Sequence, residues 1–303
     1  MKKTLINLQS SQYEHPFDRA ALESLRKMTG FDSIVNFVLN WTYIKWHVVE
    51  LCGSNFHVTK ESCPELYKMV CQSAEILDVD RLPEVYTQWS YAINAYTTGY
   101  KDNTILVIHS GAVDLMPDKE LDFIIGHEMG HIKSGHVLYH AMVNYFAQIV
   151  TSRVLAGKLL LPIQISLNYW NRMSEFSADR AGLLACQDLD AALTAIMKMA
   201  GIPKRYFDIA DPHKFVKQAE EFMVKYGDTA DTVIRNISIL DDTHPWTILR
   251  AYQLIKWVES GEYDKILNEN GGQTCPICKK PVSKDLSVCP VCGHSFKQLY
   301  QLL

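Results

Sequence analysis

Apolar side chains recur every three or four positions along most of this chain, which is the spacing of amphipathic helices. Three short stretches alternate or are uniformly apolar instead and favour strands. Helices are predicted within 17–52 and at 64–77, 189–200 and 214–226, and strands at 85–90, 94–98 and 105–108. This pattern predicts an α+β fold that is mainly helical and contains a small β-sheet.

A further helix is predicted just after the last strand. Asp118 is a suitable N-cap, and the acidic residues at 118 and 120 favour the positive end of the helix dipole. An apolar stripe then follows at helical spacing, formed by Leu121, Ile124, Ile125 and Ile132.

This helix contains the sequence His-Glu-Met-Gly-His at residues 127–131. Positions i and i+4 lie on one helix face, so His127 and His131 can bind the same Zn²⁺ with bonds of about 2.0–2.1 Å. Glu128 stands one step around the helix, where it can serve as a general base toward water without binding the metal. The motif therefore predicts a catalytic zinc centre.

A hydrolytic zinc site needs a third protein ligand and one open position. Glu175 is the candidate for that ligand, because it lies in a second predicted helix. Asp179 follows one turn later on the same face, where its carboxylate can accept the spare ring N–H of a ligand histidine.

With these motifs, the chain resembles the HtpX-like and CAAX-prenyl-protease-like zinc metallopeptidases, metallopeptidase family forty-eight. The matching segments are 94–99, the strand with Ser110 and Gly111, 120–132, 172–180 and 243–246, with Arg250 downstream. The resemblance implies a zincin-like gluzincin with His127, His131 and Glu175 on zinc. It also implies that Glu128 is the base and that Asp179 supports a ligand histidine.

The resemblance further assigns His244 to the wall of the zinc site, as a hydrogen-bond donor to the oxyanion. Arg250 would hold neighbouring structure or a substrate carbonyl. His136 and His140 form another i, i+4 pair, but no acidic partner is evident in the sequence. A structural role is therefore favoured for them over a second metal site.

Two Cys-x-x-Cys pairs lie near the C-terminus. Four thiolates close a tetrahedral Zn²⁺ site at about 2.3 Å and leave no open position, so this zinc is structural. The ligands are Cys275, Cys278, Cys289 and Cys292. The segment is too short for a core of its own, so the metal would stabilise its fold as a zinc ribbon.

The predicted division is a metallopeptidase domain at 1–267, a linker at 268–274 and the ribbon at 275–303. The first domain includes a helical lead-in at about 1–63. The whole chain has 303 residues and is 48% hydrophobic, which is sufficient for one large core plus the ribbon. A net charge of −4 argues against nucleic acid as a partner. Structural thiolate zinc favours a reducing cytoplasm. The four remaining cysteines are expected to be buried free thiols. The alternative is that two of Cys52, Cys63 and Cys71 form a pair, or that one of them caps the catalytic zinc.

No signal peptide or membrane-spanning helix is predicted. The segment 137–152 carries no Asp, Glu, Lys or Arg, but it is shorter than the roughly 20 residues a span requires. The segment 154–170 is interrupted by Lys158 and is expected to break at Pro162. Peripheral contact with a membrane through this apolar region stays open.

The sequence thus predicts a zinc metalloendopeptidase that uses one catalytic and one structural Zn²⁺ and cleaves protein or peptide substrates. The alternative is a latent or non-enzymatic zinc protein that binds a protein partner through the ribbon.

Overall fold

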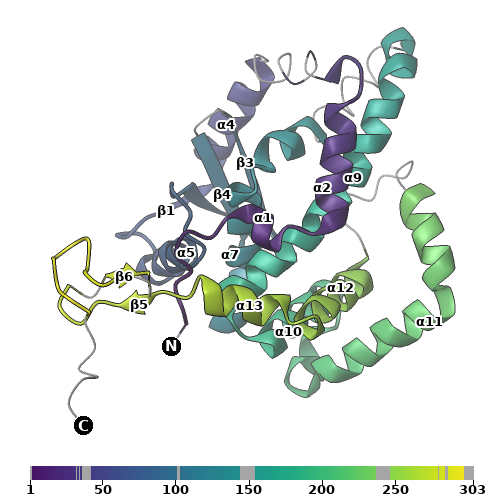
Figure 1. Ribbon diagram of the computed structural model, residues 1–303. Coiled ribbons are helices and arrows are strands. Elements are labelled where there is room, and N and C mark those ends of the chain that lie inside the picture. The colour runs from purple at the N-terminus through teal and green to yellow at the C-terminus, as the bar shows by residue number, and fades with distance from the viewer. Residues whose placement is uncertain are drawn as a thin grey trace.

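A four-stranded mixed sheet lies beside a group of long helices in the computed structural model (Figure 1). The structure describes residues 2–31, 33, 35, 42–100, 103–143, 154–236, 246–278, 280–283 and 286–296. The strands are β1 (Phe56–Val58), β2 (Glu84–Gln88), β3 (Ala95–Tyr100) and β4 (Asn103–His109). Their order is β1-β2-β4-β3, with β2 and β4 parallel and the other two pairs antiparallel, so β3 forms one edge.

Helices make up most of the described chain. They are α1 (Ser10–Tyr13), α2 (Pro16–Arg26), α4 (Thr42–Ser54), α5 (Pro64–Ile76), α6 (Ser110–Leu115), α7 (Asp118–Lys133), α9 (Val154–Cys186), α10 (Leu189–Met199), the 3₁₀ helix η1 (Lys204–Ile209), α11 (Pro212–Asn236), α12 (Thr247–Glu259) and α13 (Glu262–Glu269). The predicted α+β class is confirmed, and β2, β3 and β4 lie where strands were expected. Strand β1 was missed, because only one of its three residues is buried.

The two helices that carry the predicted zinc residues, α7 and α9, cross at very close range. A Cβ atom added to Gly126 would lie 2.3 Å from the Cβ of Ala185, and one added to Gly130 would lie 2.4 Å from the Cβ of Ala181. Both distances are too short for any side chain, so glycine is required at these two positions. The close crossing positions the histidine motif next to Glu175.

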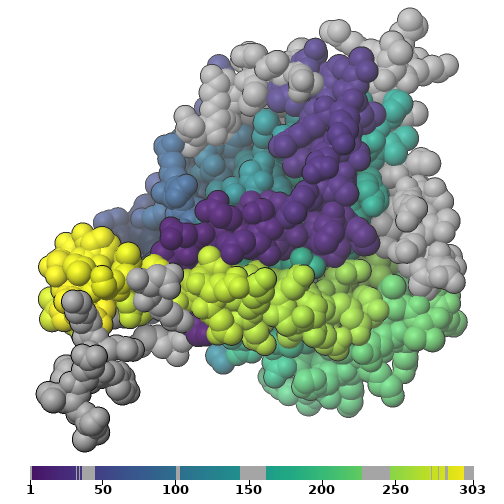
Figure 2. Space-filling view, viewed as in Figure 1, coloured from purple at the N-terminus to yellow at the C-terminus, as the bar shows by residue number. Residues whose placement is uncertain are grey.

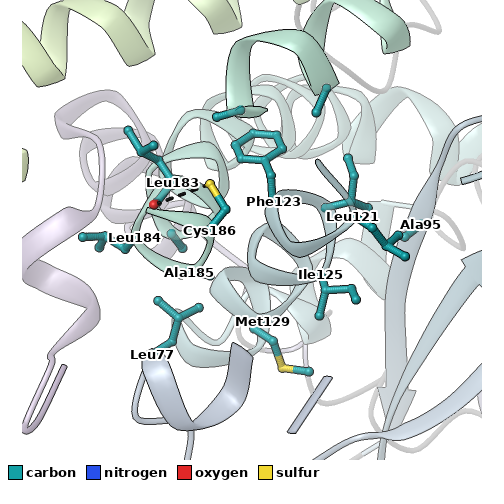
Figure 3. Close-up of a cluster of buried hydrophobic side chains, with 14 of the residues drawn as sticks. Leu77, Ala95, Leu121, Phe123, Ile125, Met129, Leu183, Leu184, Ala185 and Cys186 are labelled. Atoms are coloured by element: carbon teal, nitrogen blue, oxygen red, sulfur yellow. Dashed lines mark hydrogen bonds between the residues drawn. The ribbon is translucent and has the colours of Figure 1, made fainter. Parts of the chain in front are cut away.

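Apolar side chains surround this crossing and hold it together (Figure 3). Phe123 and Ile125 of α7 are fully buried with Leu183 and Leu184 of α9. Full burial of such a side chain contributes roughly 1.5–3 kcal/mol, so a few of these contacts fix the helix pair firmly. Packing therefore positions the site before any ligand binds.

Two local expectations about these helices are wrong. Pro117, not Asp118, is the N-cap of α7, and no side chain caps that end of the helix. Helix α9 continues through Pro162 instead of breaking there. A proline inside a helix removes one backbone hydrogen bond, and here the remainder of a 33-residue helix, which packs against α7 and α2, outweighs that loss.

The N-terminal segment runs as a band across one face of the molecule, alongside the segment that contains α12 and α13 (Figure 2). Leu5 and Tyr13 are fully buried within it, and Leu5 forms a bridge with Gly271. Helix α2 then lies along α9 (Figure 1). The predicted helical lead-in is thus an integral part of the packed structure.

A second, two-stranded sheet forms beyond α13. Strand β5 (Gln273–Thr274) pairs with β6 (Pro281–Val282), and the N–H of Gly272 donates to the carbonyl of Thr4. Strand β5 therefore lies inside the segment expected to be a linker. The proposed domain limits stay a prediction.

Among the helices of the described residues, none combines the length and the apolar character needed to cross a lipid bilayer.

Candidate active site

Three side chains from the two crossing helices converge on one point. The Nε2 atoms of His127 and His131 lie 3.2 Å apart. Glu175 of α9 places its Oε2 atom 3.5 Å from Nε2 of His127 and its Oε1 atom 3.3 Å from Nε2 of His131. All three residues are buried. The predicted ligand set is therefore brought together, from segments more than forty positions apart in the sequence.

These spacings match what zinc requires. A tetrahedral ion with bonds of about 2.0–2.1 Å holds its ligand atoms roughly 3.3 Å from one another. The three observed separations are 3.2, 3.3 and 3.5 Å. Two imidazoles and one carboxylate are also the donor types of hydrolytic zinc sites. His127, His131 and Glu175 could therefore hold this metal.

Behind His127 lies a carboxylate that fixes its ring. Oδ1 of Asp179 is 3.0 Å from Nδ1 of His127. Arg250, from α12, donates two hydrogen bonds to Asp179, from Nη2 to Oδ1 at 2.6 Å and from Nε to Oδ2 at 2.8 Å. The same guanidinium lies 3.5 Å from Oε2 of Glu175. Arg250 thus places its single positive charge between two buried carboxylates.

The pKa values of the side chains in this cluster are strongly shifted from their ordinary values. Burial would lower the pKa of His127, but hydrogen bonds to Asp179 and Glu175 outweigh it and raise the pKa to about 9. Burial lowers the pKa of His131 to about 4. Burial would raise the pKa of Asp179, but Arg250 and His127 lower it overall. Perturbed titration of this kind is typical of functional sites.

Glu128 lies beside the convergent ligands, in a cleft between α7 and strand β3. It is buried. The cleft is lined by the metal-site residues and by the first part of the edge strand: Asn94, Ala95, Tyr96, Thr97, Ile124, His127, Glu128, His131, His140, Asn171, Glu175, Met199 and Arg250. The cleft is therefore bounded by the first part of β3 on one side and by the candidate metal site on the other.

Comparison with known proteins shows to which family the chain belongs. The model of peptidase family M48 matches residues 63–258. The chain belongs to peptidase family M48. It is similar to the plastoglobule-localized metallopeptidase 48 of Arabidopsis thaliana, with 27% identity over 86% of this chain and 76% of the relative. It is also similar to a protease HtpX homolog of Polynucleobacter necessarius, with 25% identity over 68% of this chain and 77% of the relative. No solved structure matches the chain.

Membership of family M48 makes this chain an HtpX-like, zinc-dependent protease. The matched region ends within α12 and includes every predicted residue of the catalytic centre. His244 lies in the matched region but outside the residues that the structure describes. Its assignment to the wall of the site stays a prediction.

Two other histidines of this M48 peptidase, His136 and His140, lie beside His131. No acidic partner of His136 was evident in the sequence, but its Nε2 atom lies 3.2 Å from Oδ2 of Asp18, on helix α2. Nδ1 of His136 is 3.0 Å from Nδ1 of His131. His140 places Nε2 3.1 Å from Oγ of Ser174. Asp18 was missed, because no local pattern links a residue of α2 to the end of α7.

The four ribbon cysteines also come together in the M48 chain. Their ligand atoms all lie within 4.8 Å of one another, with Sγ–Sγ distances of 3.6 Å for the pairs Cys275–Cys292 and Cys278–Cys289. Tetrahedral Zn–S bonds of about 2.3 Å require sulfurs roughly 3.8 Å apart. This cluster could therefore bind a metal ion, separately from the catalytic centre.

Proposed function

We propose that this chain is a zinc metalloendopeptidase whose catalytic zinc is held by His127, His131 and Glu175. The observation that carries this proposal is the convergence of the three side chains across two helices: the two Nε2 atoms lie 3.2 Å apart, and the two carboxylate oxygens of Glu175 lie 3.5 Å from His127 and 3.3 Å from His131. Three protein ligands leave the fourth position of a tetrahedral ion for water or substrate, which is the arrangement of hydrolytic zinc rather than structural zinc.

When bound, zinc supplies Lewis-acid polarisation of the scissile carbonyl and lowers the pKa of water toward about 7. Glu128 accepts the proton from the attacking water, because its carboxylate borders the cleft directly beside the ligand His127. The same carboxyl group then passes that proton to the leaving amine, so Glu128 ends each turnover in its starting state.

Other residues keep these groups in place. Asp179 accepts the Nδ1 proton of His127, which directs the Nε2 lone pair of that ring toward the metal. Arg250 holds Asp179 in position through its two hydrogen bonds. His244 would donate a hydrogen bond to the oxyanion that develops on the substrate.

The substrate would bind as an extended strand along β3. This strand is at the edge of the four-stranded sheet, and residues 94–97 line the cleft opposite Glu128. Backbone pairing with an edge strand binds peptides with little regard to their sequence, and pockets for side chains then add preference. A protein segment threaded in this way would be cut internally.

The test is the substitution Glu128→Gln. It removes the base but keeps the shape of the side chain, so the variant should retain its zinc content and lose nearly all cleavage of casein. Glu65→Gln changes an exposed glutamate of α5 and serves as the matched control. Cleavage by Glu128→Gln at the rate of the control would contradict the proposal.

The second zinc would be structural, on the four ribbon cysteines, and the ribbon would serve as a docking surface. Ile277 and Val291 lie within the two Cys-x-x-Cys turns and are 65% and 61% exposed. Apolar side chains held outward on a rigid turn favour contact with a protein partner over nucleic acid. None of the eight cysteines forms a disulfide. Binding of zinc by thiolates favours a reducing compartment such as the cytoplasm.

A peripheral contact with a membrane is also part of the proposal. Trp89 and Tyr91, between β2 and β3, are 79% and 80% exposed and pack edge to face. Aromatic side chains of this kind favour the interface between lipid and water. Flotation with phospholipid vesicles tests this contact, and the Trp89→Ser variant should float less.

A further inference from the structure

The ring of His131 has a partner on the side that faces away from the metal site. Its Nε2 atom points at His127 and Glu175, while its Nδ1 atom lies 3.0 Å from Nδ1 of His136. His136 is 1% exposed, and its Nε2 atom lies 3.2 Å from Oδ2 of Asp18. The three side chains therefore form a continuous chain from the metal site to helix α2.

The backbone at the end of α7 produces this contact. Gly135 adopts a left-handed conformation with a φ of 70°. The N–H of His136 donates to the carbonyl of His131 at 2.9 Å, and the N–H of Gly135 donates to that of Ile132 at 3.1 Å. This pair of bonds is a Schellman motif, which turns the chain back on the last helical turn. His136 is thereby returned to the face of the helix that carries His131.

The protons of this chain can be assigned from its geometry. A histidine that binds metal through Nε2 carries its proton on Nδ1, so His131 donates from Nδ1 to Nδ1 of His136. His136 then carries its own proton on Nε2 and donates it to Asp18. With neutral rings, this is the arrangement of protons in which both the His131–His136 contact and the His136–Asp18 contact have one donor and one acceptor. The carboxylate at the far end therefore selects the tautomer of His131 that leaves Nε2 open for metal.

Asp18 is itself held rigidly. Its carboxyl group is 2% exposed and accepts hydrogen bonds from Nε1 of Trp170 at 2.8 Å and from Oγ of Ser177 at 2.6 Å. Burial would raise the pKa of Asp18, but His136 and these two donors lower it overall, so the group is a carboxylate. Trp170 and Ser177 belong to α9, the helix that also supplies Glu175.

We infer that Asp18 and His136 are positioning residues for the metal ligand His131, as Asp179 is for His127. This inference rests on the proposed zinc site. It assigns a function to the N-terminal helix α2, which lies outside the region matched by the family. Partners of metal ligands at this distance change metal affinity or activity by roughly 10–100-fold when they are lost.

The experiment measures metal binding in the Glu128→Gln protein, so that neither peptidase activity nor self-cleavage affects the measured affinity. Cobalt replaces zinc, because cobalt on thiolates absorbs strongly by charge transfer and cobalt on imidazole and carboxylate absorbs weakly. The two sites are then titrated separately in one sample. Asp18→Asn should lower cobalt affinity at the histidine site about 10-fold and leave the ribbon site unchanged.

A pair of substitutions at His136 separates the positioning of His131 from a general effect on packing. His136→Asn keeps an amide oxygen near the position of Nδ1 and should retain more affinity than His136→Leu, which keeps no acceptor. This pair leaves Asp18 intact, so it remains informative if Asp18→Asn fails to fold. Ser24→Ala changes an exposed serine of α2 outside this chain of residues and serves as the control that should leave cobalt affinity unchanged.

The double variant Asp18→Asn/His136→Leu shows whether Asp18 acts on His131 through His136. If Asp18 acts only through His136, the double variant binds cobalt as weakly as His136→Leu alone. Losses that add, or unchanged affinity in Asp18→Asn, would overturn the inference while leaving the proposed zinc site intact. A third cobalt ion bound among His131, His136 and His140 would also overturn it. A parent protein with no cobalt at the histidine site would overturn the proposed function as well.

Discussion

Arg250 donates two hydrogen bonds to the carboxylate of Asp179, from Nη2 at 2.6 Å and from Nε at 2.8 Å. Both side chains are buried, and Asp179 is in turn 3.0 Å from the ring of His127. A buried carboxylate this close to a metal ligand would be costly without a matching cation. The orientation of His127 therefore depends on a residue of α12, more than a hundred positions away in the sequence.

Arg250→Lys should weaken the catalytic centre although charge is conserved. Lysine presents a point charge and cannot make both hydrogen bonds to Asp179, so the carboxylate would lose its fixed orientation. We expect kcat/KM and zinc affinity to fall by roughly 10–100-fold. Lys256→Ala on the same helix removes only an exposed ion pair and is the control. Equal kinetics in the two variants would refute the role assigned to Arg250.

Gly130→Ala should destabilise the fold although alanine is the better helix former. The new Cβ would lie 2.4 Å from the Cβ of Ala181, so α7 and α9 would be forced apart. Overpacking of this kind costs about 1–3 kcal/mol in the free energy of unfolding, measured with urea. Adding Ala181→Gly should recover part of that loss, because it removes the atom that clashes. A stabilised Gly130→Ala protein would show that the helices do not approach this closely.

Stability should fall between pH 6.5 and pH 4 because of His15. This residue is buried, caps α2 by accepting from the N–H of Phe17, and contacts Gln253. Burial and the charge of Arg180 lower its pKa from 6.5 to about 4. In that window the unfolded chain binds a proton that the folded chain does not, so stability decreases as pH falls. The full effect is on the order of 3 kcal/mol.

The variant His15→Asn isolates this contribution. Asparagine can still cap the helix but cannot titrate. The free energy of unfolding should therefore decrease less between pH 7 and pH 4 in the variant than in the parent. Parallel curves for the two proteins would show that His15 is protonated in the folded state.

Cys275→Ser should remove one metal ion and leave the helical body intact. The apolar cluster of the ribbon, which contains Cys275, Val282 and Cys289, is separate from the main core. Metal analysis should give about one zinc per chain instead of two, with unchanged helical circular dichroism and retained casein cleavage. Loss of both zinc ions would show that the ribbon and the catalytic centre fold as one unit.

Much of the site could be predicted from the sequence because its main elements are local. The histidine pair needs only one helix, and each ribbon turn needs only four residues. Helices α5 and α10 followed from apolar spacing within one residue of their ends. Periodicity reports which face of an element is buried, which is enough for these features.

The features that were missed depend on tertiary contacts. Asp18 meets His136 only because α2 lies along α9, and the sequence carries no signal of that docking. Strand β1 exists because β2 provides hydrogen-bond partners for three residues that are mostly exposed. Pro162 lies inside α9 although proline disfavours the interior of a helix, because packing of the rest of the helix outweighs that cost.

In the proposed site α7 supplies two ligands and α9 the third, so the ligand set spans two helices that are made one after the other. A growing polypeptide that has left the ribosome only as far as the histidine motif holds an incomplete set of donors. Glu175 and then Arg250 must emerge and dock before the proposed set and its support are complete.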